Sequence, residues 1–313
     1  MLLILPKALW PVSLLLGLCV LTFFLSYVAP GDPARIILGP SATQQNVNAL
    51  RTEMGLDRPV MVQFGQFLGE TLTGRWGVSW LTRQPVLEEI GDHLRPTISL
   101  GFLASIYSIT TALVLNVLAF AFPRLGGLLI PLLRLGIAVP GFVVSVAAAL
   151  GMISLQSITG PLAGDGLQSY AVPALAVALY PTCVMAALLR DRIGDIMGLP
   201  FFRAGRASGY SLADQFMRIL LPNSWPVLFT AWVNQISVLV FSTIVVEYVF
   251  SFRGIGSLLI RSIQGKDLPV ISGIILLNGF FFLLVHTVSK IRFRADGFEP
   301  SQHGIKPEAI PAP

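Results

Sequence analysis

The amino-acid sequence predicts an all-α, polytopic membrane protein with six transmembrane helices. The first observation is composition: 54% of the 313 residues are hydrophobic and only 12% are charged, whereas soluble domains usually carry about 25% charged residues. The second is that the chain contains six apolar runs of spanning length, since a helix needs roughly 20 residues to cross the bilayer. Lipid is therefore the expected solvent for most of the surface.

Charged residues, proline or glycine bound the six runs. In chain order the runs cover residues 8–31, 97–122, 135–154, 170–189, 223–246 and 270–289. The first run is long for the apolar region of a signal peptide, and residues 27–30 (YVAP) make a poor cleavage site, so we expect a retained first helix. Cys19 and Cys183 lie inside apolar runs and are expected to be small buried hydrophobes without a metal.

The Lys and Arg residues of the short loops predict the orientation of the helices. Three segments on one side of a six-helix chain carry them: Arg124 and Arg134; Arg190, Arg192, Arg203, Arg206 and Arg218; Lys290, Arg292, Arg294 and Lys306. This side, with Lys7 and both termini, is expected to be cytoplasmic, although Arg253, Arg261 and Lys266 on the other side oppose the assignment. The net charge of +5 includes no run of basic residues, so no nucleic-acid partner is expected.

Residues 32–96 form the predicted extracytoplasmic excursion between the first two spanning helices. Residues 42–54 predict a short helix that ends at Gly55. Residues 59–72 predict a second helix, in which Pro59 lies near the first turn. Its apolar stripe is formed by Val60, Phe64, Phe67, Leu68 and Leu72. Gly74 and Gly77 then mark a turn.

Residues 190–222 form a second segment outside the membrane, on the predicted cytoplasmic side. Residues 198–200 (GLP) break the chain, residues 201–208 predict two turns of helix, and Gly209 suits a left-handed end. Ser211 and Asp214 resemble a capping box that opens the next helix, and Pro222 is expected to end that helix. The short helix either docks on another protein or is a solvated basic loop.

Several motifs in this order resemble the permease subunits of binding-protein-dependent ABC importers, of the peptide/nickel type. They are PGDPA at 30–34, GLDRP at 55–59, GRWGVS at 74–79, RAGRASG at 203–209, EYVFSFRGIG at 247–256 and DLPV at 267–270. The stretch 203–209 is similar to the RTARAKG of the family's cytoplasmic EAA motif. Arg75, Ser208 and Arg253 depart from the family's usual residues.

The resemblance implies a single permease domain over 1–313 with the type I ABC importer fold, in the bacterial inner membrane. It implies that two separate cytoplasmic subunits hydrolyse ATP with Mg²⁺, and this chain lacks the GxxxxGK[ST] phosphate-binding motif. It further implies a second permease subunit and an extracytoplasmic substrate-binding protein. Coupling to the ATPase is assigned to Phe202, Arg203, Ala204, Gly205, Arg206, Ala207, Ser208 and Gly209. Contact with the binding protein is assigned to Gly254, Gly256 and Asp267.

Polar residues in the fifth run are candidates for the translocation pathway. Asn234 and Gln235 either line the pore or bond neighbouring helices, because polar groups in lipid face the bundle interior. Glu247 is either a gate or pathway residue or an acid at the helix end. A stand-alone carrier or channel is the alternative function. Peptides, nickel and metal chelates stay open as cargo, and no cofactor is expected in this chain.

Overall fold

The computed structural model describes residues 10–28, 31–140, 143–144, 146–147, 150–151, 154 and 170–295. Within them the secondary structure is helical, apart from one isolated antiparallel bridge between Val78 and Pro85. The all-α fold class is thus confirmed. Much of the predicted third run after Pro140, the loop up to Ser169, and the termini with Lys7 and Lys306 lie outside the described residues.

The helices follow one another with short connections. They are α1 Trp10–Val28, α2 Pro33–Leu38, α3 Gln44–Glu53, α4 Val60–Leu72, α5 Val86–Ala121, α6 Pro123–Ala138, α8 Ala171–Met197, α9 Pro200–Ala207, α10 Leu212–Asp214, the π-helical turn η2 Gln215–Leu220, α11 Leu221–Val249, α12 Ile255–Gly265 and α13 Leu268–Ala295.

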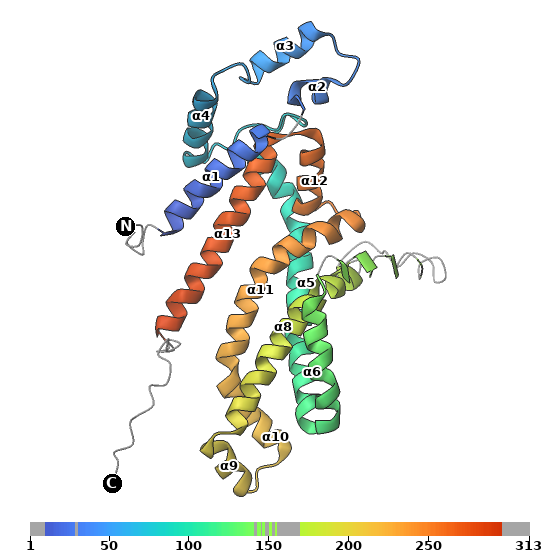
Figure 1. The fold of residues 1–313 in the computed structure, drawn as a ribbon, viewed down its shortest axis with the longest axis vertical. Helices are drawn as coiled ribbons and strands as arrows, with labels where there is room; N and C mark the ends of the chain where they lie inside the picture. The colour runs from blue at the N-terminus through green and yellow to red at the C-terminus, as the bar shows by residue number, and fades with distance from the viewer. Residues whose placement is uncertain are drawn as a thin grey trace, which may run out of the picture.

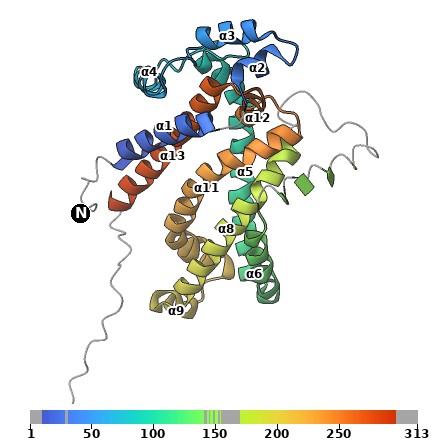
Figure 2. The same ribbon diagram turned by 45° about the horizontal axis from the view of Figure 1, so that its top comes forward.

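The long helices form a main bundle and a separate pair. α8 packs against α5, α6 and α11, whereas α1 packs along α13 (Figures 1 and 2). The excursion helices α2, α3 and α4 lie at one end of the molecule, and α9 and α10 lie at the opposite end (Figure 1). The two segments that the sequence excludes from the membrane are therefore separated by the length of the bundle.

Three described helices are long and apolar enough to cross a membrane: Val86–Ala121, Ala171–Met197 and Leu268–Thr287. α1 contributes a shorter apolar helix over Val12–Phe24. These helices correspond to the second, fourth, sixth and first predicted runs. The count of six spans stays a prediction.

Small residues let α5 and α8 approach closely. Buried Ala104, Ser108, Ala112 and Asn116 recur every four residues on α5. The Ser108 hydroxyl lies 3.2 Å from the Ala178 carbonyl oxygen of α8, and Asn116 Nδ2 donates to the Ala186 carbonyl oxygen at 3.1 Å. Close packing of small residues and hydrogen bonds between helices replace the hydrophobic effect inside lipid.

Ala112→Leu is therefore expected to destabilise the α5–α8 contact by about 1–3 kcal/mol, because overpacking forces side chains off their rotamers. Ala112 is fully buried, whereas its neighbour Thr111 is exposed on the same helix. Thermal unfolding in detergent should show a clear loss for Ala112→Leu and little change for the control Thr111→Leu. Equal losses would contradict the assigned packing face.

Both predicted excursion helices are present, as α3 and α4. Phe64 and Phe67 of α4 pack against Phe23 of α1, with ring centroids 5.3 and 5.6 Å apart. Leu72, at the end of the predicted stripe, is 74% exposed. The aromatic part of the stripe thus fixes the excursion to the first helix.

Four helix boundaries differ from the sequence prediction. Residues 123–134 belong to α6 and form no loop, and α8 continues past Arg190 to Met197. Pro222 does not end its helix, because the π-helical turn η2 places it in the first turn of α11, where proline is tolerated. α12 was not predicted at all; it forms inside the loop after the fifth run.

Candidate functional site

The short helix α9 protrudes from the end of the bundle. Leu199 is its N-cap and Pro200 its first residue, where a missing N–H costs nothing. Beyond Ser208, Gly209 adopts a φ of +81°, and the Tyr210 N–H returns to the Gly205 carbonyl oxygen at 3.3 Å. A residue with a side chain rarely adopts this left-handed conformation, so the turn favours glycine.

One aromatic side chain anchors α9 to the bundle. Phe202 is buried in the main core together with Ile196 of α8 and Phe216 of η2. A Cβ on Gly205 would press against the Ile219 side chain, which explains glycine where the resembling motif has alanine. The packed face of α9 is therefore fixed by residues of three consecutive elements.

The opposite face of α9 is exposed and basic. Arg203, Ala204, Arg206, Ala207, Ser208 and Gly209 are all exposed. Within the described part of the chain, the guanidinium groups of Arg203 and Arg206 have no hydrogen bond or ion pair. The structure thus presents a rigid, positively charged helix at the end of the bundle opposite the excursion.

Glu247 forms the centre of a buried network at the other end of α11. It is fully buried, and its carboxylate accepts the Thr97 hydroxyl at 2.7 Å and the Gly256 N–H at 2.7 Å. The Ser257 N–H adds a contact at 3.3 Å, while the Ile255 N–H donates to the Thr97 hydroxyl oxygen at 2.9 Å. A carboxylate at the N-terminus of α12 satisfies amides that have no partner within the helix. The Glu247 network therefore ties α11 to α5 and α12.

Gly254 and Gly256 belong to the same network. A Cβ on Gly254 would overlap the Glu247 carboxylate, and one on Gly256 would overlap the backbone of Ile244. Both glycines are buried. Their close packing supports the position of α12 and leaves little of their own surface for contact.

Asp267 organises the turn that follows α4. It is 1% exposed, and its carboxylate accepts the Ser79 hydroxyl, the Trp80 N–H at 3.1 Å and the Leu81 N–H at 3.3 Å. Asp267 thus joins the excursion to the connection between α12 and α13. The predicted surface residue is an internal hydrogen-bond acceptor.

Asp267→Asn should loosen this turn, because the new amide would face backbone donors with a donor of its own. We expect a cost of about 1–3 kcal/mol and faster amide deuterium exchange over residues 77–85. Asp57, which is exposed, provides the control Asp57→Asn, with unchanged exchange in the same residues. Unchanged exchange in Asp267→Asn would contradict the role assigned to Asp267.

The two predicted pathway residues of α11 point in different directions. Asn234 is exposed, whereas Gln235 is buried with its Oε1 lacking a hydrogen-bond partner in the described part of the chain. Sequence reasoning missed the roles of Thr97 and Ser79, and neither residue type signals a partner so distant in the chain.

Known proteins match the chain along its length. The family model described as "Binding-protein-dependent transport system inner membrane component" matches residues 108–295, and the corresponding N-terminal model matches residues 1–101. The glutathione transport system permease protein GsiC of Salmonella paratyphi A is 32% identical over 303 residues, covering 93% of this chain and 96% of the relative. A putative peptide transport system permease protein of Brucella abortus is 31% identical with the same coverage. The chain therefore belongs to the inner membrane components of binding-protein-dependent transport systems, as a permease subunit of an ABC importer.

Proposed function

We propose that this permease forms half of the pore of an importer for short peptides. Relatives named as glutathione and peptide transport permeases support a peptide cargo over nickel or metal chelates. The other half is a second, non-identical permease. Two cytoplasmic ATP-binding subunits drive transport with ATP and Mg²⁺, and an extracytoplasmic binding protein delivers the cargo.

The carrying observation is the exposed basic face of α9, held rigidly by Phe202. In the proposed mechanism α9 inserts into an ATP-binding subunit, so that closure of the ATPase moves the bundle as a rigid body. Residues 202–209 provide this contact. The excursion, at the far end of the bundle (Figure 1), then faces the binding protein.

Six spans complete the proposed topology. α11 has 29 residues, which at about 1.5 Å each exceeds the thickness of the hydrocarbon core. α1, α5, a span near 135–154, α8, α11 and α13 then place α9 and both termini in the cytoplasm. The binding protein would contact exposed residues of 250–269, which Gly254, Gly256 and Asp267 support from below. Asn234 and Gln235 contribute to the pathway, and the Glu247 network acts as a gate support.

Reconstituted vesicles test the cargo and the energy source together. The complete transporter should take up a labelled peptide only with ATP and the binding protein, and should leave labelled nickel outside. ATP-driven nickel uptake without peptide uptake would overturn the proposed cargo. Peptide uptake by this permease without ATPase subunits would indicate the stand-alone carrier.

A further inference from the structure

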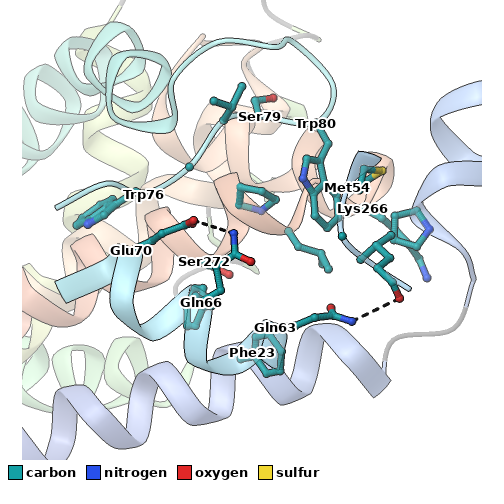
Figure 3. A pocket seen from close by; sticks show the side chains of 18 of the residues that line it. Phe23, Met54, Gln63, Gln66, Glu70, Trp76, Ser79, Trp80, Lys266 and Ser272 are labelled. Carbon is teal, nitrogen blue, oxygen red and sulfur yellow. Dashed lines mark hydrogen bonds between the residues drawn. The ribbon is translucent and has the colours of Figure 1, made fainter. Parts of the chain in front are cut away.

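A large cavity lies between the excursion and the helices beneath it. It has a volume of about 810 Å³ and is bordered by α4, the turn at 74–80, and the start of α13 (Figure 3). Phe23, Phe67 and Leu276 give it apolar walls. Binding pockets for small molecules typically measure about 300–1,000 Å³ and combine apolar walls with a few polar groups.

Three polar groups in this cavity lack partners. Ser272, on α13, is only 6% exposed and lines the cavity, yet its hydroxyl has no hydrogen bond among the described residues. The indole N–H groups of Trp76 and Trp80 also have none there. A buried hydroxyl without a partner is costly, so a ligand that offers polar backbone groups would be stabilised at this position.

The cavity carries charge of both signs. Its lining includes five basic and three acidic side chains: Arg51, Arg58, Arg75, Arg83 and Lys266; Asp32, Glu53 and Glu70. Two of the acids are neutralised, since Arg51 pairs with Asp32 at 3.2 Å and Arg83 with Glu53 at 3.2 Å. Glu70 accepts only a neutral amide, from Gln66 at 3.0 Å, and Arg58 donates to the same Gln66 side chain at 3.0 Å.

The acidic and basic groups lie at different ends. Figure 3 shows Glu70 with Trp76 on one side of the cavity and Lys266 with Trp80 on the other. Gln63, whose amide donates to the Arg58 carbonyl oxygen at 2.8 Å, lies toward the Lys266 side (Figure 3). The cavity thus has an acidic end at Glu70 and a basic end at Arg58 and Lys266, with Ser272 in its lining.

We propose that this cavity binds a short peptide with free termini, on the permease itself. The ammonium of the peptide lies at Glu70, its carboxylate at Arg58 and Lys266, and its apolar side chains against Trp76 and Trp80. The Ser272 hydroxyl bonds the peptide backbone. This inference rests on the proposed peptide cargo and adds a receiving site outside the binding protein.

Calorimetry on the full chain in lipid nanodiscs tests the site with the tripeptide alanyl-leucyl-phenylalanine. Acetylating its N-terminus or amidating its C-terminus should each weaken binding at least about tenfold, because each removes a charge-assisted contact. Glu70→Gln should weaken the free peptide by a similar factor and cancel the effect of acetylation alone. The double variant Arg58→Gln with Lys266→Gln should cancel the effect of amidation alone.

Glu88→Gln and Arg95→Gln are the matched controls, since both residues are exposed and neither lines the cavity; both should bind the tripeptide normally. Equal binding of blocked and free peptides, or no binding, would overturn the inference. Displacement of the tripeptide by short-chain phosphatidylglycerol would assign the cavity to a lipid headgroup and overturn it too. Because binding is measured on this chain alone, its failure beside intact ATP-driven peptide uptake leaves the proposed function standing.

Discussion

Replacing both Arg206 and Gly209 by glutamate should reduce ATP-driven uptake at least about tenfold, a loss of roughly 1.4 kcal/mol or more in coupling. Arg206 is an exposed cation on α9, and Gly209 holds a φ of +81°. The double change reverses charge on the docking face and strains the turn that ends the helix. The measurement is peptide uptake and ATPase binding by the reconstituted transporter.

Arg124→Glu serves as the control for this double variant. Arg124 is also exposed, and it lies at the same end of the bundle, in the first turn of α6. Its replacement should leave ATPase binding intact. Normal ATPase binding and uptake by the Arg206 and Gly209 variant would show that α9 does not couple the subunits.

Removing the carboxylate of Glu247 should cause the largest loss of stability. Glu247→Ala leaves the Gly256 N–H, the Ser257 N–H and the Thr97 hydroxyl without their acceptor in a buried site. Each unsatisfied group costs about 1–3 kcal/mol, so the variant should lose several kcal/mol and detach α12 from α5. Thermal unfolding in detergent and deuterium exchange of α12 measure the two effects.

Glu247→Gln and Thr97→Val resolve the network further. Glutamine keeps one oxygen for the α12 amides, so its loss should be clearly smaller than that of alanine. The double variant Glu247→Ala with Thr97→Val should lose less than the sum of the two single variants, because both remove the same 2.7 Å contact. Additive losses, or equal losses for glutamine and alanine, would contradict the assigned bonds.

Local signals predicted the segments outside the membrane. Residues 198–200 predicted the break before α9, and the helix at Pro200–Ala207 followed the expected two turns. Gly209 has the left-handed conformation that its position suggested. In the excursion, Pro59 and the aromatic spacing predicted α4. These features depend on neighbouring residues, which the sequence displays directly.

The buried networks could not be predicted in the same way. Thr97 and Glu247 are 150 residues apart in the chain, and Ser79 and Asp267 are 188 apart. Only the packing of α5, α11 and α12 brings these groups together. The same packing turns Asp267 from an expected surface contact into an internal acceptor, and η2 lets the helix continue through Pro222.

Cysteine labelling of α9 tests the central claim most directly, because an α9 that couples ATP hydrolysis must face the cytoplasm. The two native thiols, Cys19 and Cys183, are both buried, so Ser208→Cys introduces one accessible thiol on the exposed face of α9. A membrane-impermeant maleimide should label it in inside-out vesicles and not in intact cells, and the ATP-binding subunit should protect it. Labelling from outside intact cells would contradict the account.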